Sequence, residues 1–328
     1  MKVCVYSAQA AETEFYKHAA GSENLSFNFV SAPLSKDNIT SCFGFEGIVI
    51  TTNCRIDEET AAALEKQGVR YIACRSAGSD HVDYAAIKKH GMHCCCVPFY
   101  SPEAIAEYAI LMALKVLRCD KKLNLKLCDG DYSLPGLRGR QLDELTAGVI
   151  GTGRIGRTTI KLLSGFGTNV LGWDPYPNDA AAQLCTYVGM DELYSQSDII
   201  FLHCPLTDEN YHLINAGVID KMKDGAVIIN PARGGLVDHS AVLDALNSGK
   251  LGGFAFDVYE NEKPFVRKQK TMAEINDQIF EQLLSRDDVI YSPHIAFYTD
   301  KAIQNMIEMT IQNLCEYDAT GECRNELH

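Results

Sequence analysis

The sequence lacks the marks of membrane, secreted and nucleic-acid-binding proteins. No run approaches the roughly 18 consecutive apolar residues of a membrane-spanning helix. The apolar start at residues 1–6 is too short for a secretory signal. Basic residues are in deficit, with 30 Lys and Arg against 43 Asp and Glu and a net charge of −13, which disfavours nucleic acid and anionic membranes as partners. We therefore expect a cytoplasmic protein.

The sequence also lacks any Cys-x-x-Cys pair, although it has 13 cysteines. The odd number, without a secretory signal, indicates reduced thiols rather than a disulfide framework. The one cluster, residues 94–96, lies within the apolar run 93–97. A buried strand that uses cysteine as a small hydrophobic residue is the favoured interpretation, and metal binding is the alternative. We expect no metal site.

With 328 residues, 46% of them apolar, the chain is long enough for about two domains with cores of their own. Short β-type runs alternate with helical patterns at 57–67 and 83–90, and the alternation restarts at residue 146. This order indicates an α/β fold with parallel sheets covered by helices on both faces. The expected strands are 2–6, 47–51, 69–74, 92–97, 146–150, 169–173, 197–203, 226–230, 253–258 and 289–292.

The two halves are joined by a predicted crossover at residues 98–101. Ser101 is a candidate N-cap, and Pro102 suits the first position of a helix that continues to about residue 117. A polar stretch with Asp-Gly and Pro-Gly turn signals follows at 119–140. An amphipathic helix is predicted at 301–317.

A glycine-rich loop stands between strand 146–150 and a helical pattern that continues to about residue 164. Gly151 allows the tight turn, Gly153 leaves room for a pyrophosphate, and Gly156 lets helix and strand pack closely. The helix N-terminus offers its N–H groups to phosphates. Asp174, 18 residues past the last glycine, can accept hydrogen bonds from both ribose hydroxyls and repels a 2′-phosphate. The loop predicts NAD rather than NADP as cofactor; a purely structural turn is the alternative.

Polar residues that can do chemistry follow three later strands. Arg233 comes after strand 226–230, and its planar guanidinium matches a carboxylate. His294 follows strand 289–292, and the acidic residues Glu260 and Glu262 follow strand 253–258. Ligands of open α/β sheets bind at the carboxyl ends of the strands. A carboxylate beside the histidine would orient the imidazole and favour its protonated form, which suits a proton donor to a carbonyl oxygen.

These segments together resemble the D-isomer-specific 2-hydroxyacid dehydrogenases. The motifs are Gly-Thr-Gly-Arg-Ile-Gly, Asn-Pro-Ala-Arg-Gly-Gly-Leu-Val-Asp, Phe-Asp-Val-Tyr-Glu-Asn-Glu and Ser-Pro-His-Ile-Ala-Phe-Tyr-Thr, and the similarity runs the length of the chain. The resemblance implies two Rossmann/flavodoxin-like doubly wound domains with an active-site cleft between them. The substrate domain would be residues 1–100 plus 297–328, and the NAD-binding domain residues 101–296.

The resemblance also implies roles for individual residues. Arg233 would bind the substrate carboxylate, and His294 would be the acid in reduction and the base in oxidation. Glu262 would pair with His294 in preference to Glu260, because the family's position falls five residues after the Asp of Asp-Val-Tyr. Substrate binding is further implied for Ala77, Gly78, Tyr100 and Phe297. Cofactor binding is implied for Gly151, Gly153, Arg154, Ile155, Gly156, Asp174, His203, Cys204, Pro205, Asn210, Ala232, Arg233 and Asp257.

The branch of the family is indicated by the 37 residues from Asp257 to His294, a spacing similar to that of D-lactate dehydrogenases. Lactate-specific members often carry an aromatic residue near the end of strand 47–51, where this chain has Thr51-Thr52-Asn53. Pyruvate and larger acids such as 2-ketoisocaproate or phenylpyruvate both stay open as substrates. The family further implies a homodimer that contacts through residues 101–140. The alternative function is that of the co-repressors that resemble this fold, which bind NAD(H) as dimeric scaffolds with little turnover.

Overall fold

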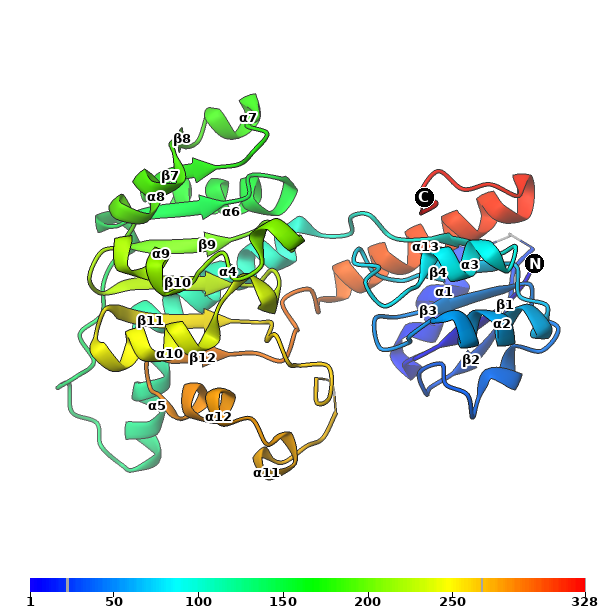
Figure 1. Cartoon of the computed structure of the whole chain (residues 1–328), viewed down its shortest axis with the longest axis horizontal. Helices are drawn as coiled ribbons and strands as arrows, with labels where there is room; N and C mark the ends of the chain where they lie inside the picture. Colours follow the sequence, from blue (N-terminus) through cyan, green and yellow to red (C-terminus); the bar gives the residue numbers. More distant parts are fainter. Residues whose placement is uncertain (22–23, 267, 328) are drawn as a thin grey trace. The chain divides into compact units, whose positions relative to one another are not determined.

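The computed structural model describes residues 1–21, 24–266 and 268–327. They form two α/β units: unit 1 comprises Met1–Ser101 and Tyr298–His328, and unit 2 comprises Pro102–Phe297 (Figure 1). Each unit is built on its own β-sheet, and every strand pair in both sheets is parallel. The predicted fold of two parallel-sheet α/β domains is confirmed.

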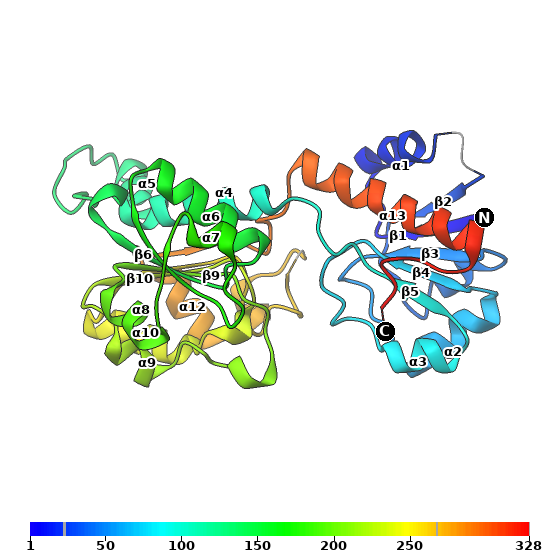
Figure 2. The same ribbon diagram turned by 90° about the horizontal axis from the view of Figure 1, so that it is seen from above.

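Unit 1 has a five-stranded sheet in the order β2-β1-β3-β4-β5. Helices α2 and α3 cover one face of the sheet, and α1 and α13 cover the other (Figure 2). The elements of unit 1 are β1 (Lys2–Tyr6), η1 (Ala10–Glu12), α1 (Thr13–Ala20), β2 (Ser26–Val30), η2 (Ile39–Cys42), β3 (Gly47–Ile50), α2 (Glu58–Gln67), β4 (Tyr71–Cys74), α3 (Tyr84–Lys89), β5 (His93–Cys95) and α13 (Asp300–Thr320).

Unit 2 has a seven-stranded sheet in the order β12-β11-β10-β9-β6-β7-β8. Helices α4 to α7 lie on one face, and α8, α9, α10 and α12 lie on the other (Figure 2). The elements are α4 (Pro102–Leu117), α5 (Asp120–Cys128), η3 (Leu142–Glu144), β6 (Thr146–Ile150), α6 (Arg154–Gly165), β7 (Asn169–Trp173), α7 (Asp179–Ala182), β8 (Thr186–Tyr187), α8 (Met190–Gln196), β9 (Ile199–Leu202), η4 (Asp208–Asn210), α9 (Ala216–Lys221), β10 (Ala226–Asn230), η5 (Gly234–Leu236), α10 (His239–Ser248), β11 (Leu251–Phe256), α11 (Met272–Ile275), α12 (Gln278–Ser285) and β12 (Val289–Tyr291).

Local sequence signals fix where several helices begin and end. The carboxylates of Asp57 and Asp83 accept hydrogen bonds from the first-turn N–H groups of α2 and α3, and the Thr299 hydroxyl caps α13 in the same way. These caps satisfy N–H groups that have no partner inside the helix. Gly68 and Gly321 end α2 and α13 in the left-handed conformation that glycine adopts without strain.

The stretch 119–140, interpreted from the sequence as polar and turn-rich, contains helix α5. None of the residues of α5 is buried, and its leucines, Leu123, Leu125 and Leu127, recur at every second residue rather than at helical spacing, so the sequence pattern does not reveal the helix. The thirteen cysteines are all free thiols. Cys94 and Cys95 lie in β5 and Cys96 follows it, all three buried, which confirms the buried-strand interpretation.

None of the described helices is long and apolar enough to cross a membrane. Within the same residues, no group of three or more His, Cys, Asp and Glu side chains could hold a metal ion.

His239, the first residue of α10, makes the stability of unit 2 depend on pH. Its ring packs against Phe254, Phe256 and Tyr259, and neither ring nitrogen has a hydrogen-bond partner among the described residues. Burial lowers the pKa of His239 to about 4, whereas a histidine of the unfolded chain titrates near 6.5. Between these two values the unfolded chain binds a proton that the folded chain does not. The stability that the neutral ring contributes is therefore present above about pH 6.5 and lost as the pH falls towards 4.

We expect His239→Leu to reduce the loss of stability that occurs as the pH falls below about 6.5. At pH 5 the wild-type chain should lose on the order of 2 kcal/mol through this one group, relative to pH 7.5, and the variant should not. Urea unfolding at both pH values measures the difference. Other buried histidines titrate in both proteins, so the test compares how much the free energy of unfolding changes between pH 7.5 and pH 5 in each protein. An equal change in both would contradict the prediction.

Candidate active site

The glycine loop joins β6 to α6 as tightly as the sequence predicts. Gly151 has a φ of +91°, and a Cβ there would lie 2.7 Å from the backbone of His203 and Cys204. A Cβ on Gly156 would lie 1.8 Å from the carbonyl oxygen of Gly151, so only glycine lets α6 pack this close to the loop. A Cβ on Gly153 would meet nothing within 4 Å, which leaves open space beside the N-terminus of α6.

Asp174 follows the end of β7, the strand next to β6 in the sheet. Its carboxylate accepts hydrogen bonds from the backbone N–H of Thr152 at 2.7 Å and of Tyr176 at 2.9 Å. The loop itself thus orients the carboxylate beside the N-terminus of α6, whose first residues are Arg154 and Ile155. The open space at Gly153, the helix N-terminus and the oriented carboxylate fit the pyrophosphate and ribose of a dinucleotide.

The segment after β9 carries His203, Cys204 and Pro205. The His203 ring is hydrogen-bonded through Nε2 to the Thr159 hydroxyl of α6 at 2.9 Å, and burial lowers its pKa to about 3, so the ring is neutral at physiological pH. Burial also raises the pKa of the Cys204 thiol to about 11. The Asn210 side chain bonds both the N–H of Thr207 and the carbonyl of Pro205, which closes the segment into a compact loop.

Arg233 follows β10 on a loop that Asn230 shapes. The Asn230 amide donates to the carbonyl of Arg233 at 2.9 Å and accepts from the N–H of Ala232 at 3.1 Å. The Arg233 guanidinium donates to the Ala232 carbonyl at 2.9 Å, and the side chain is half-buried. A cation therefore stands at the carboxyl end of the sheet, where a small anionic ligand can reach it.

His294 and Glu262 form a direct pair although 32 residues separate them in the chain. His294 Nδ1 lies 2.7 Å from Glu262 Oε1, and the other carboxylate oxygen accepts from the Tyr259 backbone N–H at 2.8 Å. Since a carboxylate only accepts, Nδ1 carries the hydrogen, and Nε2 is the nitrogen that can exchange a proton with a ligand. The side chains are 33% and 13% exposed, so the pair is accessible on the histidine side.

Asp257 anchors the segment that carries His294, a role that the sequence pattern does not reveal. Its carboxylate, 1% exposed, accepts hydrogen bonds from the Ser292 hydroxyl and from the backbone N–H groups of Ile295 and Ala296. These bonds enclose His294, whose φ of +59° is a left-handed conformation that costs energy for a non-glycine residue. Burial raises the pKa of Asp257, although these hydrogen bonds act to lower it. Asp257 thus holds the histidine segment in its strained conformation.

We expect Asp257→Asn to disturb this segment, because an amide NH2 group would face a backbone N–H donor. Stability should fall by about 1–3 kcal/mol, and kcat/KM should fall about tenfold or more, because the predicted catalytic residue His294 would be displaced. Asp198→Asn is the matched control: Asp198 also accepts from a backbone N–H, that of Thr146, but lies near Arg140 and Lys223. The control should lose stability and keep kcat/KM per folded molecule. Equal kinetics in both variants would contradict the assignment.

The predicted substrate residues Ala77, Gly78 and Tyr100 belong to unit 1. Ala77 and Gly78 lie on the loop after β4, directly past Arg75, whose buried guanidinium pairs with Glu12 at 2.7 Å. The Ser76 hydroxyl donates to the carbonyl of Gly78 at 2.8 Å, which tightens the loop. The carbonyl of Tyr100 accepts from Asn305 of α13 at 2.5 Å.

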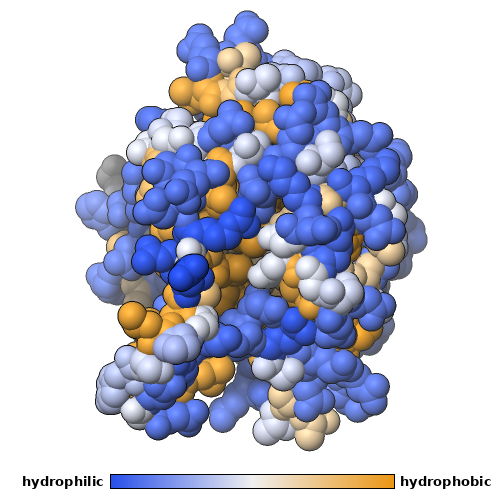
Figure 3. All heavy atoms as spheres, turned by 90° about the vertical axis from the view of Figure 1, so that its left-hand side faces the viewer, coloured by the Kyte–Doolittle hydropathy of each residue, from blue (hydrophilic) through white to orange (hydrophobic). Residues whose placement is uncertain are grey.

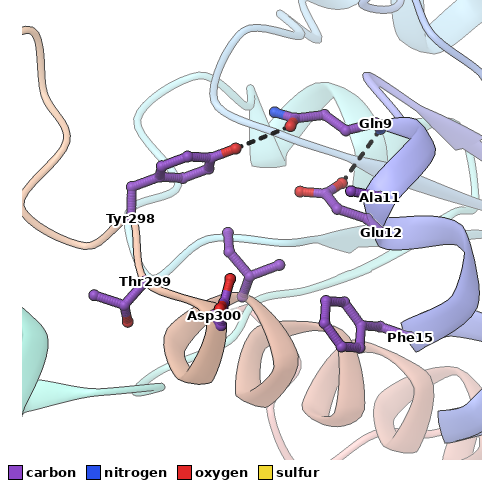
Figure 4. Close-up of a pocket in the computed structure, with 8 residues that line it drawn as sticks. Gln9, Ala11, Glu12, Phe15, Tyr298, Thr299 and Asp300 are labelled. Carbon is purple, nitrogen blue, oxygen red and sulfur yellow. Dashed lines mark hydrogen bonds between the residues drawn. The ribbon is translucent and has the colours of Figure 1, made fainter.

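A cavity of about 410 Å³ in unit 1 lies between the first residues of α13 and the start of α1 (Figure 4). The Tyr298 hydroxyl donates to the Gln9 amide oxygen at 2.9 Å, and the N–H of Gln9 donates to Glu12 at 3.4 Å. These bonds fix the start of α13 within unit 1. Phe297, the last residue of unit 2, is half-buried.

Unit 2 thus carries the three predicted catalytic residues and the predicted cofactor residues at the carboxyl ends of its strands. Arg233 follows β10, the Asp257–Glu262 segment follows β11, and His294 follows β12, and these three strands are neighbours in the sheet. The chain can therefore present one cation and one proton-transferring imidazole beside a dinucleotide loop. Asp257 was missed as an anchor because its partners lie 35 to 39 residues later in the chain.

Comparisons with known proteins agree with this chemistry. Residues 110–296 match the family model described as D-isomer specific 2-hydroxyacid dehydrogenase, NAD binding domain. The chain is 38% identical to the D-lactate dehydrogenase of Escherichia coli (strain K12) over 328 residues, covering 100% of both. It is 37% identical to the aromatic 2-oxoacid reductase of Clostridium sporogenes (strain ATCC 15579), covering 99% of both. A solved structure of D-2-hydroxyisocaproate dehydrogenase matches with a TM-score of 0.92 and 35% identity, covering 100% of this chain and 99% of the other.

The family model spans more than half of the chain, and the relatives match it over their full length. These relatives are enzymes, which confirms the enzyme interpretation over that of a scaffold with little turnover. The chain belongs to the D-isomer-specific 2-hydroxyacid dehydrogenases, the NAD-dependent oxidoreductases that act on the CH–OH group of 2-hydroxy acids.

Proposed function

We propose that Arg233, His294 and Glu262 carry out the reduction of a 2-keto acid to the (R)-2-hydroxy acid in this chain. The observation that supports this most is the hydrogen bond of 2.7 Å between His294 Nδ1 and Glu262 Oε1. It leaves Nε2 as the proton-exchanging atom and places a negative charge where it stabilises the imidazolium. A buried structural histidine would not keep a third of its side chain exposed.

The mechanism follows from what each side chain can do. The Arg233 guanidinium binds the carboxylate of the keto acid. Substrate binding by Ala77 and Gly78 of unit 1 stays a prediction from the family resemblance. His294 donates its Nε2 proton to the carbonyl oxygen as the carbonyl carbon is reduced. Glu262 keeps the ring oriented and stabilises its charged form before the proton leaves. Bound NADH supplies the hydride.

The cofactor residues in this proposal are those of the glycine loop, Asp174 and the segments after β9 and β10. Gly153 and the N-terminus of α6, at Arg154 and Ile155, would take the pyrophosphate, and Asp174 the ribose hydroxyls. The ionised Asp174 would repel a 2′-phosphate, which favours NADH over NADPH. The remaining cofactor residues are His203, Cys204, Pro205, Asn210, Ala232 and Asp257.

The substrate class in this proposal is 2-keto acids from pyruvate to those with branched or aromatic side chains. Thr52 is exposed just past the end of β3, where a larger aromatic residue would fill more space. The two relatives compared above are named for D-lactate and for aromatic 2-oxoacids. Tyr100 and Phe297 are further side chains for contact with the substituent.

The test is NADH oxidation with pyruvate, 2-ketoisocaproate, phenylpyruvate and glyoxylate side by side. We expect turnover with pyruvate and with at least one larger acid. Thr52→Tyr should shift the ratio of kcat/KM values towards pyruvate, and Asn53→Gln is its control at the neighbouring exposed position. Absence of turnover with all four acids, despite NADH binding, would contradict the proposal.

We further propose a cytoplasmic homodimer that contacts through residues 101–140. Several large apolar side chains of this region are exposed: Leu123, Leu125, Leu127, Tyr132 and Leu134. Figure 3 shows one face of the molecule, on which apolar side chains lie between hydrophilic ones. A partner copy that covers such side chains removes apolar surface from water. Mass analysis in solution tests this, with Leu134→Glu expected to weaken the dimer.

A further inference from the structure

Glu260 lies in unit 2 at a point where three loops meet, and the mechanism above does not use it. Its carboxylate accepts a hydrogen bond from the Tyr211 hydroxyl and lies 3.2 Å from His212 Nε2. The rings of Tyr211 and His212 stack with centroids 4.0 Å apart. We name these three residues, Tyr211, His212 and Glu260, the Glu260 cluster.

The cluster joins the loops that follow β9, β10 and β11. Tyr211 and His212 end the loop that carries His203 to Asn210, and the N–H of His212 donates to the Gly235 carbonyl of the Arg233 loop at 2.8 Å. Glu260 itself lies between Asp257 and Glu262 on the loop after β11. Each of these loops contributes residues assigned above to the reaction or the cofactor.

The loops that meet at the Glu260 cluster pack closely against one another. A Cβ on Gly234 would lie 2.3 Å from the backbone nitrogen of Glu260, so the loop beside Arg233 packs directly on the Glu260 main chain. A Cβ on Gly235 would lie 2.9 Å from Leu206 and 3.5 Å from the Tyr211 ring. A change in the Glu260 segment is therefore transmitted to the loop of Arg233.

The charge state of the cluster favours a lasting contact. Partial burial acts to raise the pKa of Glu260, but the hydrogen bonds from Tyr211 and His212 outweigh it and keep that pKa below its ordinary value. The carboxylate is ionised at neutral pH, and its hydrogen bonds are charge-assisted. Its side chain is 27% exposed and that of His212 29%, so solvent weakens these bonds less than in a fully exposed pair.

We propose that Glu260 is a positioning residue for the reaction: through Tyr211 and His212 it fixes the loop after β9 relative to Arg233 and Glu262. This inference rests on the proposed function. The side-chain hydrogen bonds of Glu260 in the described part of the chain go to Tyr211 and His212, and His294 is bonded by Glu262 instead. Glu260 acts by holding three loops in one arrangement, so that the groups they carry are in place before the substrate binds.

The experiment compares Glu260→Ala, Glu260→Gln and Tyr211→Phe with the wild-type enzyme. Glu260→Ala should lower kcat about 10- to 100-fold, because small displacements of reacting groups are costly. Glu260→Gln should recover most of kcat, since the amide oxygen still accepts from Tyr211. Tyr211→Phe should fall between the two. With NADH deuterated at the transferred position, the isotope effect on kcat should rise in Glu260→Ala, because hydride transfer then becomes slower than the conformational steps.

Glu274→Ala is the matched control, because Glu274 pairs with Lys270 and caps α11 in the same stretch of chain. It should lower the melting temperature while kcat and the isotope effect stay unchanged. Wild-type kinetics and isotope effect in Glu260→Ala would overturn the inference, whatever its melting temperature. If Glu260→Ala does not fold, Tyr211→Phe decides: wild-type kinetics and isotope effect in that soluble variant overturn the inference. Lack of turnover in the wild-type enzyme would instead contradict the proposed function.

Discussion

His294→Gln is expected to lower kcat on the order of 10³-fold while NADH still binds. Glutamine can occupy the place of the ring, but its amide does not give up a proton at neutral pH. The carbonyl oxygen therefore loses its proton donor. The glycine loop and Asp174 follow β6 and β7, which are separated from β12 by at least three strands of the sheet, and should keep their affinity for NADH. Stopped-flow reduction and NADH fluorescence titration measure the two effects separately.

The matched control for this variant is His93→Gln. His93 Nδ1 also pairs with a carboxylate, Glu326, at 2.7 Å, but it lies in unit 1 on β5. Its loss should leave kcat unchanged. Near-normal turnover in His294→Gln, or an equal loss in His93→Gln, would remove His294 from the mechanism.

Arg233→Gln is expected to lower kcat/KM for the keto acid about 10²- to 10³-fold. The guanidinium provides charge-assisted hydrogen bonds to the substrate carboxylate, and a neutral amide replaces them poorly. Most of the loss should appear as a raised KM, with some fall in kcat because the carboxylate also positions the keto group. Steady-state kinetics with pyruvate and phenylpyruvate measure both constants.

Arg140→Gln controls for the removal of a cation from unit 2, because Arg140 pairs at 3.0 Å with Asp198, which precedes β9, whereas the residues of the proposed site follow their strands. Its KM should match that of the wild-type enzyme. A KM for Arg233→Gln within about twofold of wild type would show that another group binds the carboxylate.

The strands of both sheets could be predicted from the sequence because parallel strands buried on two faces are continuous apolar runs. All ten expected strands are present, with ends within two residues of the prediction. The strands β2 and β8 were missed: Ser26–Val30 is only partly buried, and Thr186–Tyr187 has just two residues. The helices α7 to α12 were not predicted individually, because several are short and capped by residues that also occur in turns.

The candidate site could be located from the sequence wherever a polar residue directly follows an apolar strand. Arg233, His294 and Asp174 are of this kind. The anchoring of His294 by Asp257, and the contact of Gly234 with Glu260, depend on which strands are neighbours and on the exact path of each loop. A sequence pattern contains neither piece of information.

The double engagement of Glu262 has a consequence for the direction of the reaction. One carboxylate oxygen is bound by the Tyr259 backbone N–H and the other by His294 Nδ1. Nδ1 therefore keeps its hydrogen whether Nε2 has given up a proton or taken one. We therefore expect no ring flip between successive turnovers and little reorganisation energy. The same nitrogen then serves both reduction and oxidation, and the ratio of keto acid to hydroxy acid, the ratio of NADH to NAD+ and the pH together set which one prevails.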